Sequence, residues 1–166
     1  MRKSALFAFA PITAAVAIAG CGGSGGSAGS GGGGHSKAAP SQAASSAPTV
    51  ALAPSKFGKI LVGSHGRTLY DFVADKTTSS TCYGACASLW PPLTVSGAPK
   101  AGPGIRASLL GTTKRTDGTT EVTYNGHPLY YYAGDTKAGD TTGQDINQFG
   151  ALWYVLTANG AEVTHG

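Results

Sequence analysis

Short apolar runs separated by turn residues make up the chain beyond residue 49, and none continues with the period of a long helix. The runs are rich in β-branched and aromatic residues, as strands are. They predict strands at residues 57–63, 67–73, 109–115, 119–124, 127–132, 151–157 and 161–163. Asp117-Gly118 and Asn125-Gly126 predict tight hairpin turns between neighbouring strands. The pattern therefore predicts a mainly β protein with a small antiparallel β domain.

Two short segments, residues 82–89 and 144–149, are the candidate helical turns. Trp90-Pro91-Pro92 must end the first of them, because proline lacks an N–H group and clashes with a continuing helix. Ser64-His65-Gly66 separates the first two predicted strands. Histidine is enriched at positive φ, so His65 is expected to be a turn residue and not a ligand.

A six-residue sequence motif, called the phrase below, occurs twice in the chain, 60 residues apart. Residues 70–75 and 130–135 both have tyrosine at the first position, an aromatic residue at the third and aspartate at the sixth. The likeness continues into the flanking sequence, with Gly66 matching Gly126, Val62 matching Val122, Leu69 matching Leu129 and Trp90 matching Trp153. The match predicts two repeats, at about residues 56–98 and 116–163. Each repeat is expected to need the other to bury its apolar face.

The phrase supplies six candidate motif residues: Tyr70, Phe72, Asp75, Tyr130, Tyr132 and Asp135. On a strand the two aromatic positions of each copy share one face. We expect these aromatics to form a core between the repeats, with the hydroxyl groups bonded at its rim. The aspartates stand where the strands run into polar loops, and there they are expected to cap turns. The alternative is a ligand- or ion-binding role for the phrase.

The amino terminus has the pattern of an export signal. Arg2 and Lys3 precede an uncharged apolar run that is short for a bilayer span. Ile18-Ala19-Gly20-Cys21 resembles a bacterial lipoprotein box, which implies cleavage of residues 1–20 and acyl chains on Cys21. An ordinary signal peptide is the alternative. Residues 21–48 are rich in Gly, Ser, Ala and Pro, and we expect a disordered tether in front of the domain at 49–166.

The charge of the mature chain gives no sign of a nucleic-acid partner. Removing Arg2 and Lys3 leaves ten basic and eight acidic side chains, a net charge of +2. Lys114-Arg115 is the densest basic spot, and we expect it to be a solvated turn.

Cys82 and Cys86 are the two cysteines of the predicted domain. An exported chain meets oxidising conditions, so a pair this close is expected to form a disulfide. The alternative is a redox or metal-handling site formed by the pair, with His65 or His127 as a further member. No Cys/His spacing completes a zinc site, and Asp135, Asp140 and Asp145 lack EF-hand spacing, so no metal and no cofactor are expected.

Three blocks together carry a family resemblance: the doubled phrase, Cys82-Tyr83-Gly84-Ala85-Cys86 with Trp90-Pro91-Pro92-Leu93, and Gly143-Gln144 with Trp153-Tyr154. They resemble the secreted-repeat lipoproteins of bacteria that carry a Y-x4-D motif. The resemblance implies export, lipid anchoring and tandem repeats, and it implies no catalytic residues. Asp145 departs from it, because such proteins often have glycine after the glutamine.

These observations predict an exported lipoprotein of the cell envelope. Acyl chains on Cys21 would hold it to the outer face of the cytoplasmic membrane or to the outer membrane. No nucleophile, base and orienting group are clustered in the sequence, so the expected role is a non-enzymatic binding or structural module. An envelope protein or a glycan is the expected partner. The alternative function is an envelope redox or metal-handling accessory that uses Cys82 and Cys86.

Overall fold

The computed structural model describes residues 49–164. The predicted signal, Cys21 and the predicted tether lie outside the described residues. Within residues 49–164, no helix is long and apolar enough to cross a membrane.

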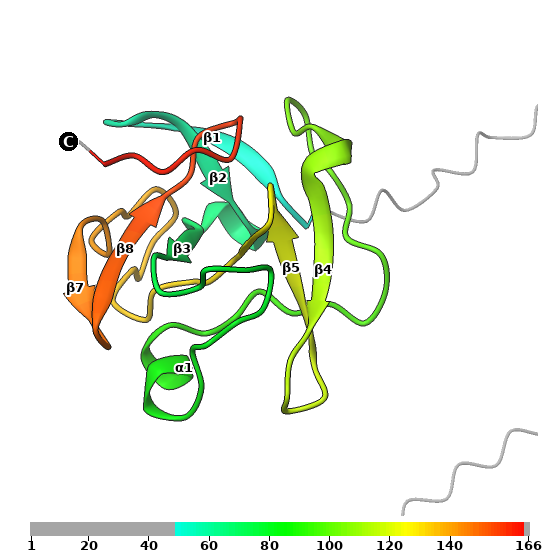
Figure 1. The fold of residues 1–166 in the computed structure, drawn as a ribbon. Coiled ribbons are helices and arrows are strands. Elements are labelled where there is room, and N and C mark those ends of the chain that lie inside the picture. The colour runs from blue at the N-terminus through cyan, green and yellow to red at the C-terminus, as the bar shows by residue number, and fades with distance from the viewer. Residues whose placement is uncertain (1–48, 165–166) are drawn as a thin grey trace, which may run out of the picture. The chain divides into compact units, whose positions relative to one another are not determined.

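The described chain is mainly β, as predicted, with short strands joined by irregular loops (Figure 1). Residues 49–164 contain eight strands: β1 Ala51–Ser55, β2 Gly58–Val62, β3 Tyr70–Phe72, β4 Leu110–Lys114, β5 Thr120–Tyr124, β6 His127–Pro128, β7 Ile146–Gln148 and β8 Ala151–Val155. In this part of the chain, helical structure is limited to α1 Ala85–Leu89 and the 3₁₀ turns Ser64–Gly66 and Ala107–Leu109.

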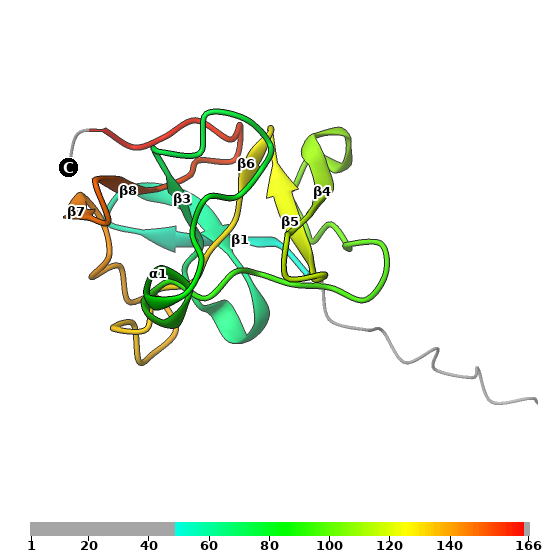
Figure 2. The same ribbon diagram turned by 60° about the horizontal axis from the view of Figure 1, so that its bottom comes forward.

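The strands form three small antiparallel sheets, in the orders β1-β2, β3-β8-β7 and β4-β5-β6. Figures 1 and 2 show the β4–β5 hairpin and the β7–β8 hairpin on opposite sides of the domain, with β3 between them. The predicted Asp117-Gly118 turn joins β4 to β5, and the Asn125-Gly126 turn joins β5 to β6.

The backbone of each repeat pairs with the backbone of the other, an arrangement called the strand exchange below. Strand β3 of the first repeat pairs with β8 of the second, where Tyr70 lies opposite Val155. In the reciprocal arrangement, Tyr130 of the second repeat pairs with Pro92 of the first. At the centre Tyr70 and Tyr130 exchange two backbone hydrogen bonds, of 2.8 and 2.9 Å. Each repeat therefore completes the strand pairing of the other, which is why neither can bury its apolar face alone.

The core consists of residues that the exchange brings together in pairs. One cluster contains equivalent leucine and valine positions from both repeats: Leu61 with Val122, Leu69 with Leu129, and Leu93 with Leu156. The Leu61 N–H donates to Leu156 O at 3.0 Å, and the Val122 N–H donates to Leu93 O at 2.8 Å. Leu61, and not Val62, therefore occupies the place of Val122. The connection from Val62 to Thr68 is one residue longer than that from Thr123 to Pro128, which shifts the alignment.

The predicted and observed elements differ at several places. The strand predicted at 161–163 is only an isolated bridge between Leu156 and Glu162. The predicted helix at 144–149 is wrong: β7 occupies its centre and forms a hairpin with β8. Asp145 and Phe149 bracket that strand with φ of 60° and 57°, values that a right-handed helix excludes. The helical turn predicted at 82–89 is confined to α1. Strand β1 was not predicted, because Pro54 interrupts its pattern and marks it as an edge strand.

Candidate functional site

The repeated phrase forms two crossed tyrosine–aspartate pairs. Tyr70 Oη donates to Asp135 Oδ2 at 2.7 Å, and Tyr130 Oη donates to Asp75 Oδ2 at 2.6 Å. Each tyrosine thus bonds the aspartate of the other repeat. Burial, together with the nearby carboxylates, raises the pKa of both phenols. The two hydroxyl groups therefore remain protonated donors across the physiological range.

The second oxygen of each aspartate closes a loop of its own repeat. Asp75 Oδ1 accepts from the N–H and the hydroxyl of Thr81, at 2.7 and 2.6 Å. Asp135 Oδ1 accepts in the same way from Thr142, at 2.9 and 2.6 Å. The aspartates do tie loops to the strand ends, but their partners lie six and seven residues on, not the two expected of a simple capped turn.

The aromatic residues of the phrase lie in a stack that alternates between the repeats. Phe72 stacks on Trp153 with ring centroids 4.1 Å apart, and Trp153 stacks on Trp90 at 3.9 Å. Tyr132 extends the stack beyond Trp90 at 4.3 Å. Phe72, Trp90 and Trp153 are buried, whereas Tyr132 is half-buried against the cluster. The aromatics of the phrase are therefore packed in the core or against it.

Tyr70 and Tyr130 each contact one tryptophan of this stack. Tyr70 meets Trp90 edge-on at 5.3 Å, and Tyr130 meets Trp153 edge-on at 5.2 Å. Gly143 lies directly against the first pair, and its N–H reaches Tyr70 Oη at 3.2 Å. A Cβ atom there would lie 2.8 Å from Trp90 and 2.9 Å from Tyr70, so only glycine fits.

Cys82 and Cys86 form a disulfide, with Cα atoms 5.2 Å apart, and both residues are buried. The bridge packs on the aromatic cluster of the core. The second repeat has no cysteines at the equivalent place. Ile146 packs there against the same cluster, whereas Phe149 is 48% exposed.

Arg115 is buried, and the expectation of a solvated turn is wrong for it. The side chain is 0% exposed and donates from Nη1 to Glu121 Oε2 at 2.7 Å and to Ser80 Oγ at 2.6 Å. Its Nη2 donates to Cys82 O at 2.7 Å. Since Ser80 Oγ also lies 2.6 Å from Tyr130 Oη, a buried polar chain runs from one Tyr–Asp pair to Glu121. Burial raises the pKa of Glu121 to about 7, although Arg115 lowers it.

A second cluster of charged groups lies on the other face of β3. Asp71, His127 and Glu162 place one ligand atom each within 4.8 Å of one another. The Asp71 carboxylate raises the pKa of His127, and burial together with Asp71 raises the pKa of Glu162. Only the alternation along the strand, which sets Asp71 on the face opposite Tyr70, hints at this cluster in the sequence.

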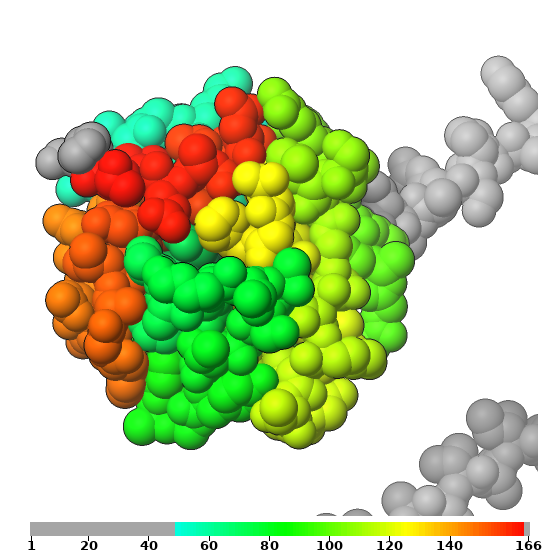
Figure 3. All heavy atoms as spheres, in the orientation of Figure 1, coloured from blue at the N-terminus to red at the C-terminus, as the bar shows by residue number. Residues whose placement is uncertain are grey.

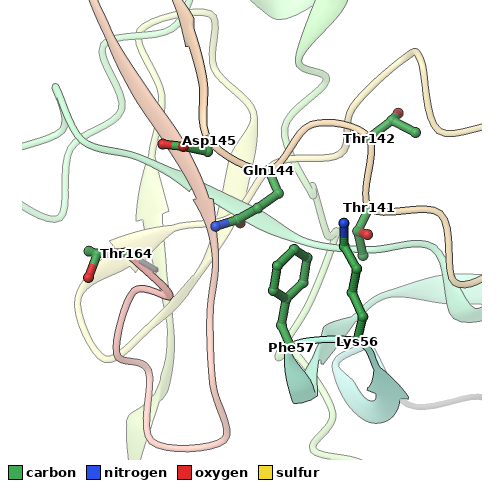
Figure 4. Close-up of a pocket in the computed structure, with 7 residues that line it drawn as sticks. All are labelled: Lys56, Phe57, Thr141, Thr142, Gln144, Asp145 and Thr164. Carbon is green, nitrogen blue, oxygen red and sulfur yellow. The ribbon is translucent and has the colours of Figure 1, made fainter. Parts of the chain in front are cut away.

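A polar pocket of about 310 Å³ lies where the β1–β2 turn meets the loop before β7 (Figure 4). Seven residues line it: Lys56, Phe57, Thr141, Thr142, Gln144, Asp145 and Thr164. Figure 4 shows the Phe57 ring and the Lys56 chain side by side, both directed toward Gln144 and Thr141. The Lys56 Nζ lies 4.7 Å from the centre of the Phe57 ring. The sequence did not predict this pocket, because its parts are far apart along the chain.

Gln144 is fixed by hydrogen bonds to two later segments. Its Nε2 donates to Val163 O at 2.6 Å, and its Oε1 accepts from the Val155 N–H at 2.7 Å. The following residue, Asp145, has a positive φ of 60°, the conformation that glycine adopts most easily. The loop keeps its tight turn in spite of the aspartate.

Comparison with known proteins gives one family. The model of a lipoprotein family described as a secreted repeat of unknown function matches residues 52–94 and 111–157, one match for each repeat. No curated protein and no solved structure was found to match the chain. The two matches cover more than half of the chain and contain both copies of the phrase, both tryptophans and the strands that the repeats exchange. The chain therefore belongs to this family of secreted repeats.

Proposed function

We propose that the protein is a lipid-anchored, non-enzymatic module of the cell envelope that binds a glycan through the pocket at Phe57. The chain is a secreted repeat, which agrees with an envelope location. The hydroxyl groups of Tyr70 and Tyr130 and the carboxylates of Asp75 and Asp135 are used in bonds between and within the repeats. Ligand binding is therefore assigned to the loops that this framework carries.

The pocket at Phe57 is the observation that carries the proposal. It combines an aromatic face with an amine, an amide, a carboxylate and three hydroxyl groups. Pockets that orient a small ligand pair apolar surface with a few placed polar groups, and this volume is at the lower end for such sites. The C–H face of a sugar ring can lie against the aromatic ring while its hydroxyl groups bond to the rim. The volume suits one terminal or side-branch unit of an envelope glycan.

Binding of the intact, detergent-solubilised protein to purified peptidoglycan tests the ligand. Phe57→Ala and Lys56→Ala should each reduce the fraction that sediments with the glycan by several-fold. Phe149→Ala is the matched control, because Phe149 is an exposed phenylalanine outside the pocket. Equal retention of wild type and Phe57→Ala would refute the glycan site, and retention on envelope protein alone would replace the glycan with a protein partner.

Anchoring through Cys21 is the second half of the proposal. Its support is the sequence: an uncharged apolar run that ends in Ala19-Gly20-Cys21. Several acyl chains hold a protein firmly on a bilayer, since each buried methylene contributes about 0.8 kcal/mol. Cys21→Ala should move the protein from the membrane fraction to the soluble fraction. Continued sedimentation of the processed variant with membranes would refute the lipid anchor.

A further inference from the structure

The geometry around Asp71 points to a binding site for a late first-row divalent cation such as Zn²⁺, and we propose that Asp71, His127 and Glu162 are its ligands. The three residues come from separate parts of the chain: β3, the start of β6, and the segment after β8. Their ligand atoms lie within 4.8 Å of one another. In Figure 3 the red C-terminal segment, the yellow segment around the turn before β6 and the green loop after β3 lie next to one another on the surface.

Asp71 is the unusual member of the cluster. It is 1% exposed, and neither of its carboxylate oxygens has a hydrogen-bond partner among the described residues. Burying an ionised carboxylate without such partners costs several kcal/mol, so buried carboxylates are normally paired or bound to a metal. Each of the other buried carboxylates among the described residues accepts at least one hydrogen bond: Asp135 accepts from Tyr70 and Thr142, and Glu121 accepts from Arg115 through Oε2, although its Oε1 has no partner. Asp71 has oxygens available for another ligand.

The distance from Asp71 to His127 fits a shared metal better than a hydrogen bond. His127 Nδ1 lies 3.4 Å from Asp71 Oδ2. An N–H···O hydrogen bond is usually about 2.7–3.2 Å long. Two ligands bound to one tetrahedral Zn²⁺ at about 2.0–2.1 Å lie roughly 3.3 Å apart. The histidine nitrogen and the buried oxygen are thus already at the separation of two zinc ligands.

The charges of the cluster also favour a divalent cation. Two carboxylates, Asp71 and Glu162, face one imidazole. Lys76 is the nearby cationic side chain, and its charge acts on Glu162, while Tyr154 lies opposite Asp71 on β8. His127 and Lys76 must both be charged to balance the two carboxylates, whereas one divalent cation balances them alone. The nitrogen ligand favours Zn²⁺ or Cu²⁺ over Mg²⁺ and Ca²⁺, which prefer oxygen ligands alone.

The other repeat provides an internal comparison. The positions equivalent to Asp71 and His127 are Tyr131 and Arg67, and there the guanidinium group of Arg67 lies over the Tyr131 ring at 4.7 Å. In the other repeat a cation–π pair therefore occupies the place that Asp71 and His127 occupy here. The three metal-binding side chains occur on one side of the pseudo-symmetric domain only, as expected of a site added to a common framework.

The site can be reached from solvent through His127. The residue is 30% exposed and lines a shallow cavity of about 270 Å³ together with the loop at 75–78 and the Asn125-Gly126 turn. Three protein ligands beside such an opening leave a coordination position for water or for a further ligand. The site therefore resembles an exchangeable metal site more than a closed structural one.

Zn²⁺ titration of the intact, metal-stripped protein by calorimetry tests the proposal. We expect one Zn²⁺ per chain, and His127→Gln and Glu162→Gln should each weaken the affinity at least tenfold. Arg67→Gln is the matched control at the equivalent position, and His35→Gln controls for binding by a histidine outside the described residues. Both controls should retain wild-type affinity, and Mg²⁺ at the same concentration should give no measurable binding.

Asp71→Asn separates metal binding from a merely structural role. The amide removes a buried charge, so the metal-free variant should melt at or above the wild-type temperature, while the rise in melting temperature on adding Zn²⁺ should be lost. Circular dichroism of the metal-free variants checks that each remains folded. Absence of stoichiometric binding in the wild type, or binding that survives all three ligand substitutions, would overturn the proposal and leave the cluster as an ion pair.

Discussion

Removing the hydroxyl group of Tyr70 should destabilise the domain, because that group joins the two repeats. The buried phenol donates to the Asp135 carboxylate at 2.7 Å and accepts from the Gly143 N–H at 3.2 Å. A hydrogen bond to a charged group contributes about 1.5–3 kcal/mol, and Tyr70→Phe also leaves the N–H of Gly143 without its acceptor. We expect a loss of about 2–3 kcal/mol in the free energy of unfolding. Tyr130→Phe should cost at least as much, since its hydroxyl contacts both Asp75 and Ser80.

These losses are large enough to measure in a thermal melt. For domains of this size, 1 kcal/mol shifts the melting temperature by about 4 °C, so each substitution should lower it by roughly 8–12 °C. Tyr131→Phe is the matched control, because among residues 49–164 the Tyr131 hydroxyl has one hydrogen bond, which it accepts from the exposed Ser64 N–H at 3.2 Å. The control should lose less than about 1 kcal/mol.

A pair of double-mutant cycles identifies the partner. Tyr70→Phe combined with Asp135→Asn should show a coupling free energy of about 1 kcal/mol or more, because the two side chains bond directly. Tyr70→Phe combined with Asp75→Asn, both in the first repeat, should be closer to additive. If the pair within one repeat couples as strongly as the crossed pair, the reasoning from crossed hydrogen bonds is refuted.

Three further perturbations test the core, the bridge and the buried charges. Phe72→Ala should cost about 3–5 kcal/mol and leave the domain largely unfolded in a circular-dichroism melt, because it removes one end of the aromatic stack; a wild-type melt would contradict this. Replacing Cys82 and Cys86 by alanine should lower stability by about 2 kcal/mol without abolishing folding, since the closed loop is short; free thiols in the native protein would count against the bridge. Folding raises the pKa values of Glu121 and His127, so the folded protein binds more protons than the unfolded chain between about pH 5 and pH 8. The free energy of unfolding, measured in urea with a metal chelator present, should therefore fall as the pH rises from 5 to 8. Glu121→Gln should flatten this slope, and an unchanged slope would contradict the assignment.

The part of the fold that the sequence predicts rests on local patterns. The strands β2, β4, β5 and β8 follow from β-branched and aromatic runs, and the turns after β4 and β5 follow from Asp117-Gly118 and Asn125-Gly126. These signals depend on neighbouring residues alone. The residues at 144–149 carried no such signal, and there the pairing with β8, a tertiary interaction, determined the strand.

The polar contacts could not be predicted, because they join residues that are far apart in sequence. Arg115 lies in a turn, yet it is buried since Ser80 and the Cys82 carbonyl, both more than 30 residues away, accept its hydrogen bonds. The cluster of Asp71, His127 and Glu162 depends on how three separate elements pack. Sequence periodicity predicts which face a residue occupies, and it does not predict which distant residue lies on that face.

The spacing of the repeated phrase follows from the strand exchange. Tyr70 and Tyr130 meet as a backbone pair at the centre of the domain. The second aromatic position, Phe72 or Tyr132, follows two residues later in each copy, and β3 ends at Phe72. There the chain turns back: the Asp75 N–H donates to Phe72 O at 2.8 Å, and the Asp135 N–H donates to Tyr132 O at 3.2 Å. A turn of this kind joins residues three apart, which fixes the distance from the second aromatic to the aspartate. The turn brings each aspartate back to the centre, where the tyrosine of the other repeat lies. A single repeat would leave its phenol without a carboxylate partner and one oxygen of its aspartate without a donor. The stable unit is therefore a pair of repeats, joined in one chain as here or in two chains.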